Sequence, residues 1–294
     1  MFSQKSLAIS FLLFSTIAIS FGGLIMRQFE VANAWQITFY RNLAFFFAVF
    51  VIILVNYGQK SFKTTINLGL PGIIAAIFLA SANICFIHSL KSTSVANTLF
   101  TLSTIPFITA FIAYFVIKEF ITRRTFIIML VAFLGISMMV SEGLRTNQSV
   151  GILLALCTAV SFSSFAIILR KYKFVDMIPC LLISAMLVMG TTFFVLSGDI
   201  YIPINEIVYC FFWGGVLSGL VNSAFIYAIR HLRASEVTLY MLLEFSLGPI
   251  WVWIFLDEII STQTMIGGLI VIASVIFYSL FQLKEIKQDK AFSQ

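Results

Sequence analysis

Ten long apolar stretches, separated by short polar connections, dominate this 294-residue chain. Each stretch is close to the ~20 residues that an α-helix needs to cross a bilayer. Charged residues make up only 10% of the chain and the mean hydropathy is +1.06, whereas about a quarter of the residues of a soluble domain are charged. We therefore expect an all-α integral membrane protein with ten transmembrane helices. The expected spans are Ser6–Met26, Ala34–Val55, Leu68–His88, Val95–Ile117, Thr125–Ser141, Val150–Leu169, Met177–Leu196, Ile207–Ile229, Val237–Leu256 and Thr264–Phe281.

The basic residues of the connections fall mainly on one side of this bundle. Fourteen Lys and Arg lie on the side of the N-terminus and three on the other. The positive-inside rule then predicts a multi-pass protein of the cell membrane (the inner membrane in a Gram-negative cell) with both termini in the cytoplasm. The first apolar run is longer than the core of a signal peptide and no cleavage site follows it closely, so it is predicted to be a retained span.

Several functional classes are disfavoured by the residues present. The net charge of +6 comes from short loops beside apolar runs, so it indicates membrane orientation rather than nucleic-acid binding. The four cysteines lie inside apolar runs without disulfide or metal-ligand spacing. His88 and His231 lie at span ends without the partners that hydrolysis requires. We expect no enzyme, no catalytic residue, no metal and no cofactor.

The chain resembles itself at an offset of 139 residues. Asn83–Ile87 then falls on Asn222–Ile226, sharing N-x-x-F-I, and Glu119 falls on Glu258. Each half would hold five spans, and because five is odd, the second half enters the membrane upside down. Inverted repeats are a common plan of secondary transporters, with the substrate near the midplane. The predicted organisation is two inverted five-helix repeats, 1–145 and 146–283, followed by a cytoplasmic tail, 284–294.

Short polar motifs recur at fixed places in this pattern. FYRN surrounds Arg41 in span 2, KE ends span 4 at Glu119, LE in span 9 includes Glu244 with Pro249 beyond it, and LDE ends span 9 at Glu258. In order and spacing, over nearly the whole chain, these motifs resemble the drug/metabolite transporter superfamily, specifically the EamA-type carriers. The resemblance implies a central cavity, alternating access, and export or exchange of amino acids, related metabolites or drugs. Fold alone does not settle the substrate.

Glu244 and Arg41 are the only charged residues inside the predicted spans. A carboxylate at the depth of Glu244 costs at least ~2.5 kcal/mol unless it is protonated, paired or beside water. Helical spacing puts Tyr240, Gly248 and Trp251 on its face. Glu244 is therefore a candidate for binding a substrate ammonium group or for proton coupling, with an interhelical hydrogen bond as the alternative.

Arg41 stays charged at any relevant pH and is a candidate for binding a substrate carboxylate. The alternatives are that it reaches the outer interface or ties helices together. Its depth puts it in the opposite half of the membrane from Glu244, so direct pairing would require tilt or long side chains to bridge roughly 10 Å.

Three further polar residues and two prolines are candidates within the repeat. Asn83 and Asn222 occupy equivalent positions and could contact substrate or hydrogen-bond across closely packed helices. Thr101 matches Tyr240 and could line the cavity or bond back to its own helix. Pro106 and Pro249 free backbone carbonyls and are candidate hinges with Gly248, although prolines in spans are also tolerated without a functional role.

These patterns predict a secondary carrier in the lipid bilayer. Its substrate would be a small amphipathic or zwitterionic metabolite, because polyanions would require several buried cations and only Arg41 is present. The predicted site is lined by spans 3, 4, 8 and 9, with spans 1 and 6. Proton coupling or exchange, an uptake carrier of the same fold, a channel or scaffold, and a homodimer stay open as alternatives. Saturable, counter-flow-stimulated transport would distinguish a carrier from a channel.

Overall fold

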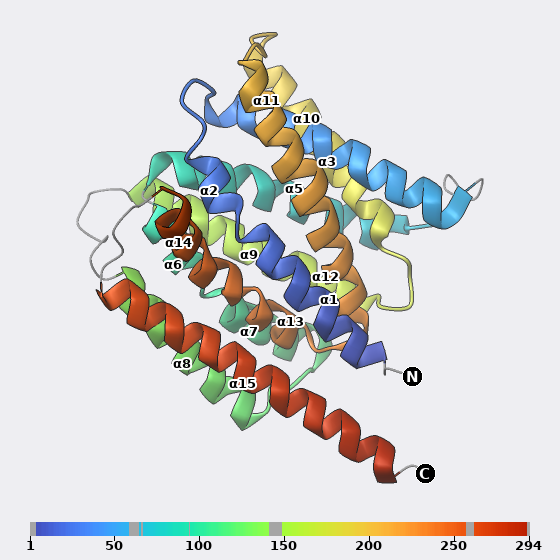
Figure 1. Ribbon diagram of the computed structural model, residues 1–294. Coiled ribbons are helices and arrows are strands. Elements are labelled where there is room, and N and C mark those ends of the chain that lie inside the picture. Colours follow the sequence, from blue (N-terminus) through green and yellow to red (C-terminus); the bar gives the residue numbers. More distant parts are fainter. Residues whose placement is uncertain are drawn as a thin grey trace.

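A computed structural model describes residues 4–58, 65, 67–93, 95–140, 149–256 and 262–292, and within them the regular secondary structure is entirely helical (Figure 1). The helices are α1 Gln4–Ile19, α2 Gly22–Met26, α3 Ala34–Tyr57, α5 Gly69–Ser92, α6 Val95–Leu102, α7 Ile105–Ile117, α8 Arg123–Val140, α9 Ser149–Lys171, α10 Ile178–Leu196, α11 Ile204–Phe211, the π-helix η2 Phe212–Ser218, α12 Gly219–His231, α13 Ala234–Tyr240, α14 Leu242–Leu256 and α15 Thr262–Phe292.

Seven segments of the described chain are long and apolar enough to cross a membrane. They are Gln4–Met26, Ala34–Tyr57, Gly69–Ser92, Ser149–Lys171, Ile178–Leu196, Ile204–His231 and Ala234–Phe255. Two shorter apolar helices, Ile105–Ile117 and Met265–Phe281, lie where the fourth and tenth spans were expected, and α8 lies where the fifth was expected. The multi-pass helical membrane class is therefore confirmed, while the number ten stays a prediction.

Three of the expected spans are interrupted, and a fourth changes from α-helix to π-helix along its length. The first breaks between α1 and α2, the fourth at Ser103–Thr104, and the ninth at Met241. The eighth passes through the π-helix η2. At the offset of 139 residues, the breaks at Ser103 and Met241 fall within one residue of each other. Transporter sites are typically built where helices are discontinuous.

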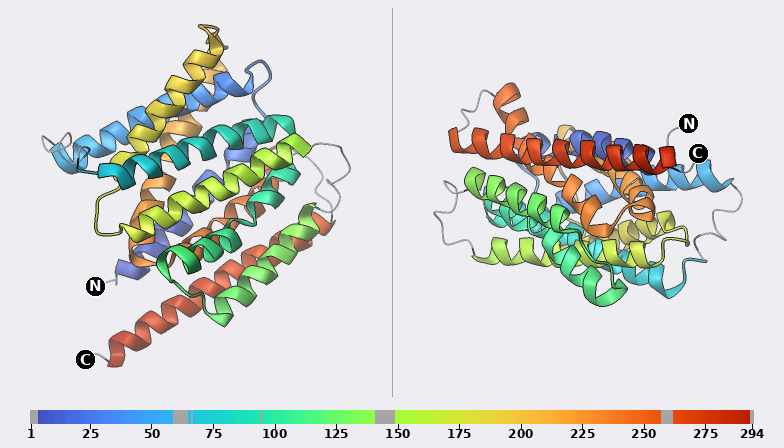
Figure 2. Two further views of the ribbon diagram at one scale, coloured as in Figure 1. Left: turned by 180° about the vertical axis from the view of Figure 1, so that it is seen from behind. Right: turned by 90° about the horizontal axis from the view of Figure 1, so that it is seen from below.

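The helices of the two halves interleave. α3 packs against α10 and η2, α5 against α9, α1 against α12, and α8 lies beside α15 along one edge (Figures 1 and 2). The end of the bundle that includes Gln4, Tyr57, Lys118, Lys171 and Arg230 is called the basic end. α1 begins at this basic end, whereas α9 begins at the opposite end (Figure 2).

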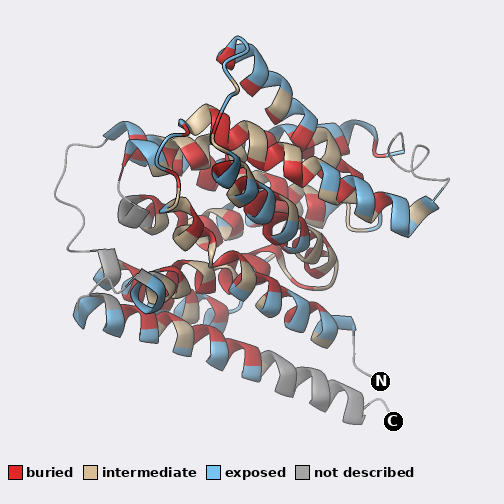
Figure 3. Cartoon of the chain, turned by 45° about the horizontal axis from the view of Figure 1, so that its top comes forward, coloured by how far each residue is buried: buried red, intermediate tan, exposed pale blue. Residues whose placement is uncertain are grey.

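Apolar side chains are abundant on the outside as well as inside the bundle. Buried residues gather where helices meet, and exposed residues face outward along the peripheral helices (Figure 3). Phe14 is 69% exposed and Phe194 is 83% exposed. A monomeric soluble protein rarely exposes apolar surface on this scale, whereas lipid tails solvate it well. The outer surface therefore suits a bilayer.

Gly214 in η2 allows this helix to pack closely against α3 at the position of Arg41. A Cβ atom at this position would lie 1.9 Å from the carbonyl oxygen of Arg41 in α3. Because the obstacle is backbone, neither helix can yield by turning a side chain. Small residues at such crossings let helices pack closely in membranes, and this one sets the position of Arg41.

We expect Gly214→Ala to destabilise the fold by at least about 2 kcal/mol, since overpacking forces backbone shifts. Gly190→Ala in α10 is the matched control, because a Cβ there meets nothing within 4 Å. Alanine should stabilise that exposed helix slightly. Thermal unfolding of both variants in detergent measures the difference. Equal unfolding temperatures for the two variants would contradict the assigned α3–η2 contact.

Candidate functional site

A cavity lies at the centre of the bundle, between the interrupted spans and the continuous helices α3, α5 and α9. Its empty volume, including open space at the mouth, is about 830 Å³. The lining residues are Ile19, Arg41, Leu79, Ala82, Asn83, Phe86, Leu102, Ile105, Thr158, Phe162, Ser218, Val221, Asn222, Phe225, Thr238, Met241, Leu242, Glu244 and Phe245.

The start of α3 fixes the position of Arg41. Asn33 caps the helix by accepting hydrogen bonds from the backbone N–H groups of Trp35 and Gln36, and Gln36 accepts one from Asn33 in return. The Gln36 amide also donates to the carbonyls of Asp199 and Tyr201, each at 3.2 Å. Such a capping box sets the first turn of a helix. Arg41 follows about two turns later on a helix that is anchored to the loop before α11.

Arg41 is only 8% exposed, and its guanidinium is held by neutral groups. It donates to Asn83 Oδ1 at 3.3 Å and to Ser218 Oγ at 3.2 Å, and it lies 4.6 Å from the centre of the Trp213 ring. Its Nε has no hydrogen-bond partner. A buried charge needs an opposite charge or full hydrogen bonding to offset desolvation. The site therefore leaves a cation ready to receive an anionic group.

Glu244 lines the same cavity from the first turn of α14, where the helix dipole favours a negative charge. Its backbone N–H bonds to the carbonyl of Met241 at 3.1 Å, at the break in the span. Among the ion pairs of the described residues, none within 4.0 Å joins Glu244 to Arg41. The two opposite charges therefore face one cavity without neutralising each other directly.

Asn83 and Asn222 occupy equivalent places on the cavity wall, as their repeat positions predict. Each side-chain amide donates to the carbonyl four residues earlier, Asn83 to Leu79 at 3.1 Å and Asn222 to Ser218 at 2.9 Å. The Asn83 amide oxygen is occupied by Arg41. Asn222 borders the cavity as well, so its amide oxygen is available to a ligand.

Other predicted site residues lie away from the central cavity. Tyr240 is fully buried on α13, with its ring 5.7 Å from that of Tyr278 on α15. Trp251 stacks on Phe21 at 4.4 Å and its indole N–H donates to Ser20 Oγ at 2.7 Å. These side chains pack between helices in this structure.

The remaining candidates lie at or near the helix interruptions. The Thr101 carbonyl accepts a hydrogen bond from the Thr104 hydroxyl at 2.6 Å, beside the break between α6 and α7. Pro106 is buried in the first turn of α7, just after this break. Pro249 lies within α14, and the interruption of its span is at Met241 instead. The side chain of Pro249 lies outside the described residues.

A second cavity, with an empty volume of about 400 Å³, adjoins the first and shares Phe86 and Glu244 with it. Its remaining lining includes Gly23 in α2, Leu90 near the end of α5, and Gly248 in α14. Leu90 is close to the end of α5, and α2 and α14 are the segments of their spans that lie away from the basic end. The two cavities together lead from the centre toward the opposite end.

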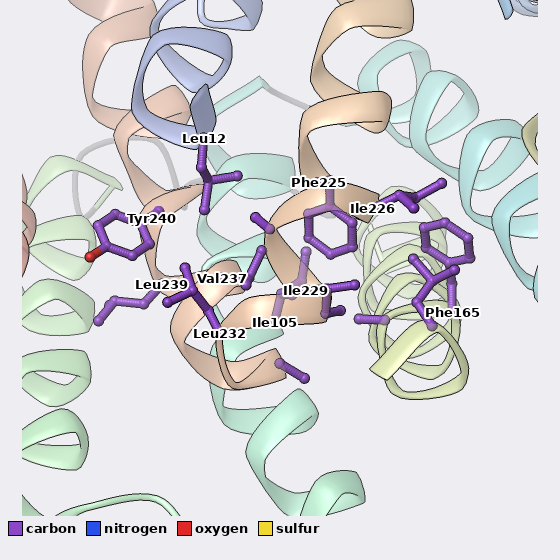
Figure 4. Close-up of a cluster of buried hydrophobic side chains, with 14 of the residues drawn as sticks. Leu12, Ile105, Phe165, Phe225, Ile226, Ile229, Leu232, Val237, Leu239 and Tyr240 are labelled. Atoms are coloured by element: carbon purple, nitrogen blue, oxygen red, sulfur yellow. The ribbon is translucent and has the colours of Figure 1, made fainter. Parts of the chain in front are cut away.

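Tight apolar packing closes the basic end. Ile105 and Phe225 form part of the cavity floor, and Ile229, Leu232 and Val237 fill the α12–α13 corner beneath it (Figure 4). All five side chains are buried. No wide aqueous passage can cross such a cluster while it remains packed, so the central site is closed on this side.

A polar network lies beneath this apolar cluster. Arg170 of α9 pairs with Glu119, its Nε at 3.1 Å and a terminal nitrogen at 2.8 Å from the same carboxylate oxygen. It also donates to the carbonyls of Ile229 and Arg230. The second Glu119 oxygen accepts from the backbone N–H of Ala234 at 3.4 Å. We call Glu119, Arg170 and these backbone groups the basic-end latch, because it joins both halves of the chain.

Four residues that line the cavities or contact Arg41 were not candidates from the sequence: Ser218, Trp213, Phe86 and Thr158. Ser218 donates to the carbonyl of Trp213 five residues earlier, at 2.9 Å, which is the spacing of a π-helix. The sequence carries no signal for this turn beyond the pair of glycines within it. Among the described residues, no group of three or more His, Cys, Asp and Glu is arranged to hold a metal.

The EamA-like transporter family matches residues 6–141 and again residues 149–280. The chain belongs to this family. As an EamA-like transporter, it carries two copies of the family unit, in agreement with the self-similarity of the sequence.

A solved structure titled "Crystal structure of protein" is similar to this EamA-like transporter with a TM-score of 0.75 and 13% sequence identity. The similarity covers 94% of this chain and 98% of the other. At this identity the likeness concerns the fold alone. Comparison with curated protein sequences gives no match.

Proposed function

We propose that this EamA-like family member is a secondary carrier of a small zwitterionic metabolite, an amino acid or a related amphipathic solute, across the cell membrane. The observation that carries the proposal is the pair of opposite charges, Arg41 and Glu244, on one central cavity without a direct ion pair. The carboxylate of the substrate would bind at Arg41 and its ammonium group at Glu244. Aromatic and aliphatic residues between them would accept the side chain.

The ten-span inverted arrangement is part of the same proposal. It is supported by the opposite starting ends of α1 and α9 and by the symmetric packing of α1 on α12 and α5 on α9. Charge supports a cytoplasmic basic end, because Lys and Arg concentrate there. The cavity then leads outward, and export or exchange would proceed by alternating access.

Reconstituted protein tests the proposal directly. Proteoliposomes should take up labelled zwitterions saturably, and preloading with unlabelled substrate should accelerate uptake. Matched amines without a carboxylate, and matched acids without an amine, should compete weakly. Protein-free liposomes give the background. Flux that does not saturate, or that ignores substrate on the other side, would instead indicate a channel.

The basic-end latch is expected to hold the cavity closed toward the cytoplasm. The reporter is Thr158→Cys, a cysteine on the central cavity in an otherwise cysteine-free protein. In this background, Arg170→Gln should increase thiol labelling from the cytoplasmic face roughly tenfold. The reason is that the variant leaves Glu119 unpaired and removes the hydrogen bonds to the α12 carbonyls. The measurement is labelling by an impermeant reagent in inside-out vesicles.

Arg230→Gln is the control for this prediction. Arg230 pairs with Asp176 at 2.8 Å at the same end, but these side chains are 28% and 30% exposed, compared with 16% for each partner of the latch. Exposed pairs contribute little, so labelling should change less than twofold. Similar labelling in the two variants would remove the latch from the mechanism.

A further inference from the structure

A groove between α7 and α8 hollows the outside of the bundle near the basic end. Its empty volume is about 730 Å³. It shares no residue with the central cavity, and only Glu119 belongs both to its wall and to the basic-end latch. Its lining residues are Phe107, Ala110, Phe111, Tyr114, Glu119, Phe120, Ile121, Phe126 and Met129.

The groove opens on the outer, lipid-facing side of the bundle. Phe111 is 67% exposed and Phe120 is 64% exposed, whereas Met129 at the floor is fully buried. Seven of its nine lining residues are aliphatic or carbon-ring side chains without a polar atom. Such a wall offers nothing to a hydrophilic solute, but it suits an acyl chain.

Positive charge borders the end of the groove that lies at the membrane surface. Lys118 ends α7 in a left-handed conformation, with φ of 54°, and its ammonium lies 5.9 Å from the ring centre of the groove-lining Tyr114. Arg123 begins α8 three residues before Phe126, and its side chain is exposed. The helix N-terminus adds partial positive charge.

The only carboxylate on the wall does not cancel this charge. Glu119 directs its carboxylate to Arg170 at 2.8 Å and to the backbone N–H of Ala234. The groove therefore combines an apolar trough with two cations, Lys118 and Arg123, at its membrane-surface end. Basic sites beside apolar surface on the cytoplasmic side of membrane proteins attract anionic lipid head groups.

We propose that this groove binds an anionic phospholipid of the cytoplasmic leaflet. The acyl chain lies along Phe107, Phe111 and Phe126, and the phosphate lies between Lys118 and Arg123. This assignment rests on the proposed orientation of the basic end and is independent of the proposed substrate. It adds a lipid ligand at the outer surface to the solute site at the centre.

Purified full-length protein in detergent tests the proposal with phosphatidylglycerol and phosphatidylcholine of identical acyl chains. Native mass spectrometry should show one retained phosphatidylglycerol, and this lipid should raise the unfolding temperature more than phosphatidylcholine does. Lys118→Gln combined with Arg123→Gln should weaken phosphatidylglycerol binding roughly 10- to 30-fold. Ala110→Trp, which fills the trough and keeps both charges, should also weaken it.

Lys171→Gln combined with Lys173→Gln is the matched control, because it removes one exposed and one partly exposed charge from the same end without touching the groove. Its phosphatidylglycerol affinity should stay within about twofold of the wild-type value. Equal losses in both double variants would indicate unspecific charge attraction and overturn the site. Equal stabilisation by phosphatidylcholine, or by inorganic phosphate alone, would overturn it too. These binding readouts do not depend on transport, so failure here leaves the proposed carrier function standing.

Discussion

Glu244→Gln is expected to reduce transport driven by a proton gradient to the level of empty liposomes, while exchange of substrate against substrate continues. Gln keeps the shape and polarity of the side chain but can neither release a proton nor carry a negative charge. In the wild-type protein, the partly buried carboxylate faces the cavity without an ion pair to Arg41. It can therefore take up a proton when the substrate leaves and release it when an ammonium group arrives.

The measurement compares uptake with and without an imposed pH gradient, and counter-flow at equal pH, in the same proteoliposomes. Glu206→Gln is the matched control, because Glu206 is also buried but its carboxylate accepts three backbone N–H bonds, from residues 30, 31 and 32. That variant should lose thermal stability and keep its pH dependence. Wild-type gradient dependence in Glu244→Gln would reject proton coupling through this residue.

Arg41→Gln is expected to raise the half-saturating concentration of zwitterionic substrates about 10- to 100-fold, the range that loss of a charge-assisted hydrogen bond implies. Arg41→Lys should recover only part of the loss, because an ammonium group cannot reproduce the planar, bidentate contact of a guanidinium. The guanidinium is positioned by hydrogen bonds to Asn83 and Ser218. We expect its positive charge, and not these two neutral residues, to determine substrate affinity.

The decisive measurement pairs this variant with a substrate change. For an amine analogue that lacks the carboxylate, Arg41→Gln should not weaken competition, because the group that Arg41 would bind is already missing. Arg27→Gln, which removes an exposed cation near the opposite end, is the control and should leave both ligands unchanged. Equal losses for the zwitterion and the amine would show that Arg41 supports the fold instead.

Much of the fold could be predicted from the sequence, because hydropathy and charge act locally along the chain. The apolar runs coincide with helices, and the repeated N-x-x-F-I places Asn83 and Asn222 on the same cavity. Helical periodicity also holds inside a single helix: Glu244 and Gly248 are one turn apart in α14 and border the same second cavity.

Periodicity fails where a span is broken. Tyr240 is four residues before Glu244, but the break at Met241 separates them into α13 and α14, so they no longer share a face. Ser218 lies at the end of the π-helix η2 and contacts Arg41. The wider turn of a π-helix changes the direction of the side chains relative to an α-helix of 3.6 residues per turn, so α-helical spacing does not predict this contact. Both effects depend on neighbouring helices, such as the crossing at Gly214, and no local pattern encodes them.

The paired interruptions at Ser103–Thr104 and Met241 have a mechanical consequence. Each divides a span into a segment near the basic end, α7 or α13, and a segment near the opposite end, α6 or α14. A span that is divided near its middle can tilt one helical segment while the other segment stays in place. Release of the solute on one face of the membrane then requires only that two short helices tilt, either α7 with α13 or α6 with α14. No whole span has to slide through the lipid.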